Sequence, residues 1–132
     1  MKIPGIEINV DSCAVPWRET GSHGVRWYLI DTAGSAARPG QGAAKDSAVL
    51  IEMDPGCGYP RHKHLGVEEV LVLRGGYRDD LGEHRCGDYV RYEEGSAHAP
   101  VAIGETSQPI SDANPICLLY AIARAGIAVS EA

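Results

Sequence analysis

The chain has no long hydrophobic run. Among its 132 residues, no apolar stretch approaches the roughly 18 residues that a membrane-spanning helix needs. The N-terminal segment MKIPGIEINVDS carries Pro4 and Glu7 where a signal peptide has an unbroken apolar core. We therefore expect a cytoplasmic protein that has no membrane partner.

Clusters of positive charge are also missing. The formal net charge is −6, the acidic residues are scattered, and lysine and arginine form no stripe along which a phosphate backbone could lie. The sequence therefore predicts no nucleic-acid partner.

Closely spaced cysteine pairs are absent as well. Cys13, Cys57, Cys86 and Cys117 lie far apart and form no Cys-x-x-Cys motif. In a reducing compartment such residues remain thiols, and a free cysteine usually packs as a small hydrophobic side chain. Cys57 lies five residues before His62 and is the one cysteine near a candidate metal site, although a packed or loop thiol is the commoner role.

Short strands and tight turns dominate the sequence pattern. Sixteen glycines and eight prolines are spread among brief apolar runs, and there is no internal repeat. The length fits one domain over residues 1–132. We expect an all-β fold with strands over residues 24–31, 47–53, 67–74, 77–79, 88–92 and 116–123.

Two of these runs are apolar on both faces. VLVL at 70–73 and ICLLY at 116–120 are typical of strands buried inside a sandwich or at a subunit contact. The segment DDLGE at 79–83 predicts a hairpin turn closed by a glycine, and AGSAARPGQGAA at 33–44 predicts a loop.

Histidine is concentrated in one pattern. The segment PRHKHLGVEEV contains His62, His64 and Glu68, and EEGSAHAP contains His98. Because side chains alternate along a strand, His62 and His64 point the same way and Lys63 points the other way. Glu68 then adds a carboxylate from the next strand. We predict that these three histidines and Glu68 hold one divalent metal ion.

The first segment resembles the first motif of the cupin superfamily, Gly-x5-His-x-His-x3-4-Glu-x6-Gly. All five positions are met, by Gly56, His62, His64, Glu68 and Gly75.

The second cupin motif, Gly-x5-Pro-x-Gly-x2-His-x3-Asn, is met in part. Gly87, Gly95 and His98 match it, whereas Glu93 replaces its proline and Ala102 its asparagine. Both replaced positions shape turns, so the predicted ligand set stays intact.

The region around both motifs, about 45–125, further resembles the cupin half of ChrR-type anti-sigma factors. The resemblance implies a double-stranded β-helix, the small jelly-roll barrel of cupins, with residues 1–22 as extra strands or an arm. It also implies a homodimer that binds a small molecule. The His-x3-Cys-x-x-Cys zinc signature of the sigma-binding half is missing, which argues against an anti-sigma role for this chain alone.

The predicted ligand set leaves the metal and the chemistry open. Nitrogen and carboxylate ligands suit Zn, Fe, Mn or Ni, with Zn and Fe the main expectations. Tetrahedral Zn would be saturated by four ligands, which gives a structural or sensory site. Octahedral Fe(II) or Mn(II) would keep two open positions for catalysis. In a third arrangement Glu68 leaves the metal and acts as a general base.

Two functions follow from these alternatives. The first is a ChrR-like metal-binding module that binds or senses a small molecule. The second is an Fe(II)-dependent dioxygenase that acts on a small diketone, aromatic or acid substrate. The sequence does not decide whether the protein is an enzyme.

Other polar residues have commoner roles outside a site. Glu69 faces away from Glu68 in a regular strand, and His23 and His84 are expected to be solvated. Candidate pocket residues are Tyr59, Tyr77, Tyr89, Tyr92 and Tyr120 and, for orienting a carboxylate, Arg61, Arg74 and Arg91. Arg74 is the strongest candidate of the three arginines, because it lies an even number of residues from Glu68 and so points to the same face of a regular strand.

Overall fold

The computed structural model describes residues 14–30 and 46–129, and in these ranges it contains β-strands and no helix. A membrane-spanning helix is accordingly absent from the described residues. The strands are β1 (Arg18–Glu19), β2 (Val25–Ile30), β3 (Ser47–Met53), β4 (His62–His64), β5 (Glu68–Arg74), β6 (Gly76–Asp79), β7 (Gly82–Arg85), β8 (Tyr89–Tyr92), β9 (Ala97–His98), β10 (Val101–Ala102), β11 (Cys117–Ala123) and β12 (Ile127–Val129).

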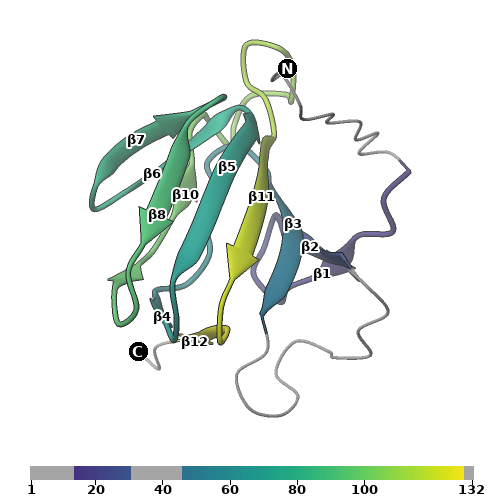
Figure 1. Cartoon of the computed structure of the whole chain (residues 1–132). Helices are drawn as coiled ribbons and strands as arrows, with labels where there is room; N and C mark the ends of the chain where they lie inside the picture. The colour runs from purple at the N-terminus through teal and green to yellow at the C-terminus, as the bar shows by residue number, and fades with distance from the viewer. Residues whose placement is uncertain (1–13, 31–45, 130–132) are drawn as a thin grey trace.

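The largest sheet has six antiparallel strands in the order β1-β2-β3-β11-β5-β8 (Figure 1). The central strand β11 pairs with β3 on one side and with β5 on the other. β11 and β5 are the two runs that the sequence marks as apolar on both faces, and strands at the centre of a sheet are the ones that such runs form. The sheet therefore brings distant parts of the chain together around β11.

Two smaller sheets complete the fold. One has the order β10-β6-β7 and the other β12-β4-β9. In Figure 1 the hairpin of β6 and β7 projects at one side, and β4 and β12 lie at one end of the large sheet. The sheet β12-β4-β9 carries His62, His64 and His98 on β4 and β9.

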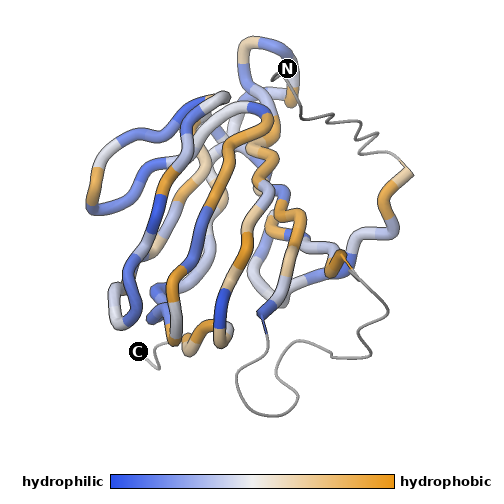
Figure 2. The backbone as a smooth tube through the Cα atoms, in the orientation of Figure 1, coloured by the Kyte–Doolittle hydropathy of each residue, from blue (hydrophilic) through white to orange (hydrophobic). Residues whose placement is uncertain are grey.

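One face of the large sheet packs on the smaller sheets and forms the core. In β5, Val70 and Val72 are buried, and Leu71 and Leu73, which alternate with them, are only half-buried. Burying a side chain of this kind contributes about 1.5–3 kcal/mol. Figure 2 shows hydrophobic residues along β3, β5 and β11 and mostly hydrophilic ones along the β6–β7 hairpin. The core thus includes the large sheet and Tyr77 of β6, while β7 has no buried side chain.

The six predicted strands are confirmed, with ends that differ by one residue at most, and so is the all-β class. The predicted hairpin turn lies between β6 and β7, and Gly82 has a φ of 118°, which favours glycine. β1 is a short extra strand within the predicted N-terminal arm; the rest of that arm up to residue 13 and the loop at 33–44 lie outside the described residues. The short strands β9, β10 and β12 were not predicted.

Candidate metal centre

Strand pairing brings the three motif histidines together. His62 and His64 are buried on β4 and Lys63 between them is exposed, as the alternation predicts. β4 pairs with β9 so that His62 lies directly opposite His98. Each histidine offers one ring nitrogen, and these three atoms all lie within 4.8 Å of one another. The three histidines are thus positioned to hold a metal ion.

Two of the rings are oriented by groups that can only accept a hydrogen bond. Nδ1 of His62 lies 3.0 Å from the carbonyl oxygen of Pro60, and Nδ1 of His98 lies 2.9 Å from Oδ2 of Asp79. Because a carbonyl and a carboxylate have no proton to give, both Nδ1 atoms carry the ring hydrogen. In the neutral rings the lone pair is therefore on Nε2.

The third ring is oriented through a hydroxyl. Ser96 donates its hydroxyl hydrogen to the carbonyl oxygen of Glu93, with the oxygens 2.6 Å apart. Its oxygen is then free to accept from Nδ1 of His64 at 2.9 Å. His64 consequently also carries its lone pair on Nε2.

The Nε2 atoms converge without a donor among them. Nε2 of His62 lies 3.0 Å from Nε2 of His98, and Nε2 of His64 lies 2.9 Å from Oε2 of Glu68. Nε2 of His64 and Oε2 of Glu68 are buried and have no hydrogen-bond partner. Buried acceptors normally find a partner, because an unsatisfied one costs about 1–3 kcal/mol. A divalent cation held by the three histidines would give Nε2 of His64 a partner, so this group of residues fits a metal.

The electrostatics of the rings agree with this fit. Burial lowers the pKa of His62 and His98 below the ordinary histidine value. Both rings are therefore neutral near pH 7, and the neutral ring is the form that binds a metal. Glu68 is buried beside His64, and its role as the fourth ligand remains a prediction.

Asp79 is a functional candidate that the sequence analysis missed. Its carboxylate accepts hydrogen bonds from His98, Tyr92, His84 and the backbone N–H of Leu81. Burial alone would raise its pKa, but the hydrogen bonds outweigh burial and lower the pKa to about 2. The expectation that His84 is solvated was wrong, because its side chain is 13% exposed and bonded to Asp79. The sequence contains one indication of this role: Tyr77 and Asp79 are two residues apart, so their side chains point to the same face of β6.

The predicted arginines do not reach the centre. Arg61 pairs with Asp80 and Arg91 pairs with Glu93, which are the strand-surface ion pairs expected as the commoner use. Arg74 as a pocket residue was wrong. The β5–β11 register shifts between Leu118 and Leu119, so Arg74 lies opposite Leu118 and is exposed. A one-residue slip turns a side chain to the other face of a sheet.

The remaining acidic residue of the motif behaves as expected. Glu69 accepts hydrogen bonds from Tyr89 and Arg124 on the outer side of the sheet. Among the candidate tyrosines, Tyr77 and Tyr92 are buried, and Tyr92 packs its ring against His64 and His98. Tyr59 packs its ring edge against His62, whereas Tyr89 is exposed, and Tyr120 is half-buried.

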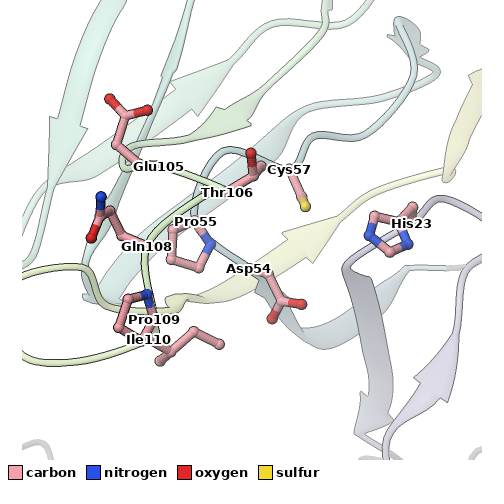
Figure 3. Close-up of a pocket in the computed structure, with 9 residues that line it drawn as sticks. All are labelled: His23, Asp54, Pro55, Cys57, Glu105, Thr106, Gln108, Pro109 and Ile110. Atoms are coloured by element: carbon pink, nitrogen blue, oxygen red, sulfur yellow. The ribbon is translucent and has the colours of Figure 1, made fainter.

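A second hollow lies elsewhere on the molecule. Its volume is about 320 Å³, and Figure 3 shows its lining residues His23, Asp54, Pro55, Cys57, Glu105, Thr106, Gln108, Pro109 and Ile110. Cys57 belongs to this hollow and packs so closely on Gly24 that an added Cβ there would lie 2.5 Å from its sulfur. His23 is exposed, as predicted. Among the described residues, only His62, His64 and His98 form a group able to hold a metal.

The antiparallel sheets and the inward-facing histidines define the class: the protein has the all-β cupin fold. Within this class, the chain belongs to the family of ChrR cupin-like domains, whose model matches residues 6–111. The resemblance drawn from the two motifs is thereby confirmed.

Similar proteins include both regulators and enzymes. The anti-sigma-E factor ChrR of Cereibacter sphaeroides is 34% identical over 88 residues, which are 67% of this chain and 36% of that protein. The structure of Rhodobacter sphaeroides SigE in complex with the anti-sigma ChrR matches with a TM-score of 0.65 and 27% identity, over 86% of this chain and 50% of that chain. This chain therefore spans only half, or less, of the ChrR chains that it matches.

Enzymes also occur among the structures that share the fold. An acetylacetone dioxygenase from Acinetobacter johnsonii matches with a TM-score of 0.66 and 13% identity, over 99% of this chain and 81% of that chain. At this identity the likeness concerns the fold.

Proposed function

We propose that this protein is a ChrR-like metal-binding module that binds or senses a small molecule at one divalent ion. The proposed ligands are His62, His64, Glu68 and His98. The observation that carries the proposal is that the ligand nitrogens of three buried histidines lie within 4.8 Å of one another, with the buried, unpartnered Oε2 of Glu68 next to Nε2 of His64. Sigma-factor binding is not part of the proposal, because the chain covers half of the ChrR chain in the SigE complex.

The protein's own residues set what the ion does. A Zn or Fe ion would supply a positively charged centre to which an oxygen or nitrogen donor of a small molecule can bind. Pro60, Ser96 and Asp79 hold the three rings so that every Nε2 faces the same point. Such preorganisation raises metal affinity because the rings lose little freedom on binding.

Metal analysis of the purified protein tests this proposal. We expect about one equivalent of Zn or Fe per chain and full recovery of binding after chelation and reloading. Co(II) substitution then distinguishes the arrangements, because tetrahedral Co(II) absorbs strongly and octahedral Co(II) weakly. A protein that retains no divalent metal under any loading condition contradicts the proposal.

A second candidate is an Fe(II)-dependent dioxygenase for a small diketone, aromatic or acid substrate. It is favoured by the mixed nitrogen and oxygen character of the four proposed ligand atoms, which suits Fe(II). Four ligands would also leave two positions free on a six-coordinate ion. In that case Glu68 either binds the ion or serves as general base. Oxygen uptake by Fe(II)-loaded protein across a panel of diketones, catechols and keto acids tests it. If the protein is a sensor instead, it should bind a small molecule without consuming oxygen.

A homodimer is our proposed assembly. Strand register lines up five side chains across the large sheet on the face opposite the core: Tyr28, Leu50, Tyr120, Leu71 and Tyr89. Tyr89 is 58% exposed, Tyr28, Leu71 and Tyr120 are half-buried, and Leu50 is buried. Tyrosine is enriched at subunit contacts, which supports the proposal at the exposed end of the row. Light scattering after gel filtration measures the mass, and a monomer at micromolar concentration contradicts the proposal.

A cytoplasmic location is proposed with the same function. It is supported by the thiols, because Cys57, Cys86 and Cys117 are all free in the structure. Cysteines stay reduced in the cytoplasm and tend to pair outside it. Cell fractionation with an antibody to the chain tests the location.

A further inference from the structure

Asp79 is the polar side chain that connects the histidine centre to the β6–β7 hairpin. Its carboxyl group is fully buried. Oδ2 accepts from Nδ1 of His98 at 2.9 Å and from the hydroxyl of Tyr92 at 2.5 Å. Oδ1 accepts from Nε2 of His84 at 2.9 Å and from the N–H of Leu81 at 3.0 Å. One carboxylate therefore joins residues of β7, β8, β9 and the hairpin turn.

We propose that Asp79 is a positioning residue of the metal centre, and that through His84 it couples metal binding to the order of the β6–β7 hairpin. This inference rests on the proposed metal site. His98 is the link, because its Nε2 faces the site and its Nδ1 is bonded to Asp79. A carboxylate in this position fixes the ring orientation of a ligating histidine and increases the basicity of its Nε2.

The number of donors requires a carboxylate. Four donors share two oxygens, and each oxygen accepts two of them. An asparagine amide has one oxygen, so its NH₂ group would face two of the donors. Tyr77 adds to the same network by donating to the hydroxyl of Tyr92 at 2.6 Å.

The coupling should act mainly on β7, because the side chains of β7 are mostly exposed whereas Gly76 and Tyr77 of β6 are buried. The tip residue Leu81 is 68% exposed, and Glu83 and Arg85 of β7 are exposed. His84 is the inward-facing residue of β7, and it contacts Asp79 and the ring of Tyr77. An ion bound to Nε2 of His98 would hold the ring against Asp79, and the carboxylate would in turn be held against His84. Because such coupling is reciprocal, a loosened hairpin weakens metal binding by the same factor.

The decisive comparison is Asp79→Asn against Asp80→Asn. Asp80 lies next in the chain, is exposed and pairs only with Arg61, at 3.4 Å, among the described residues. Measured by competition with a chromogenic chelator, Zn affinity should fall about tenfold to a hundredfold in D79N and stay within twofold in D80N. Affinity in D79N within twofold of the unaltered protein overturns the inference.

His84 gives a second comparison that leaves every proposed ligand and Asp79 in place. His84→Ala removes one donor from the carboxylate, and Zn affinity should fall about threefold, the effect of one modest hydrogen bond. His84→Gln restores a donor and should recover most of the affinity. Equal affinities in both variants and the unaltered protein overturn the coupling.

Hydrogen exchange on the unaltered protein tests the coupling without any substitution. Amides of β6 and β7 should exchange more slowly with Zn than without it, whereas those of β2 should not change. Unchanged exchange in the hairpin overturns the coupling even if D79N fails to fold. A chain that binds no metal at all overturns the proposed function as well, whereas metal binding that ignores Asp79 overturns this inference alone.

Discussion

The histidine centre and the hollow of Figure 3 contain similar chemical groups but differ in how those groups are held. The centre has three histidines and Glu68, and the hollow has His23, Cys57 and two carboxylates. In the centre every ring has an Nδ1 partner and every side chain is buried. His23 is exposed, and its ring bonds to none of the residues that the structure describes. Metal-binding capacity thus depends on orientation and burial more than on composition.

The difference has an energetic side. Rings that are already fixed lose little conformational freedom when a metal binds, whereas an exposed ring has to be ordered at the time of binding. The fixed rings also place acceptors next to each other, and this arrangement costs free energy unless a cation or a donor lies between them. The three histidines are therefore positioned to hold a cation, whereas the described residues of the hollow form no such group.

The largest effect expected is the loss of metal on replacing His64 by alanine. His64 is fully buried, and its Nε2 is one of the atoms without a hydrogen-bond partner. Removing it leaves too few ligands for tight binding, so the purified H64A protein should contain less than about a tenth of an equivalent of Zn. Elemental analysis after gel filtration measures this content.

His23→Ala is the matched control from the hollow. It removes an imidazole of the same chemistry from an exposed position, so the metal content should equal that of the unaltered protein. The comparison between the two regions fails if H23A also loses the metal or if H64A retains a full equivalent.

Replacing Glu68 by glutamine should produce two effects of opposite sign. The amide oxygen binds a divalent cation more weakly than a carboxylate does, so Zn affinity should fall about tenfold to a hundredfold. The amide NH₂ supplies the donor that Nε2 of His64 lacks, so the metal-free protein should be stabilised by about 1 kcal/mol. Chelator competition and thermal melting of the metal-free form measure the two effects.

The same substitution on the other face of β5 is its control. Glu69 bonds to Tyr89 and Arg124 and faces away from the centre, so Glu69→Gln should leave Zn affinity within twofold. If E69Q weakens Zn as much as E68Q does, the loss reflects general charge near the sheet, and Glu68 is no ligand.

Much of this arrangement was predictable from the sequence because it follows local rules. Strand alternation placed His62 and His64 on one face, and the motif spacing selected His98. The long apolar strands were also correct, because β5 and β11 contain enough residues for a pattern to stand out. Strands of two residues, such as β9 and β10, contain no period to recognise.

The parts that were missed depend on contacts between distant segments. Asp79 reads as a turn residue, and only the pairing of β6 with β7 and the packing of β9 bring His84 and His98 to its two oxygens. Arg74 was misplaced because a register shift between β5 and β11 leaves no mark in either strand alone. Both errors concern the pairing and register of strands that lie far apart in the sequence. Pairing and register depend on the whole fold, so no short segment of the sequence reveals them.

The smallest effect expected is at Cys57, where metal should change nothing. Cys57 precedes His62 by five residues, so a sequence reading admits it as a ligand, but its sulfur packs on Gly24 in the hollow. Its rate of alkylation, followed by peptide mass mapping, should therefore agree within about twofold with and without Zn, since a thiolate bound to a metal would be protected.

Two other thiols calibrate the experiment. Cys86 is exposed and should react first, and Cys117, whose pKa is raised to about 12 by burial, should react only on unfolding. Strong protection of Cys57 by Zn would join the two regions into one site and remove the distinction between them.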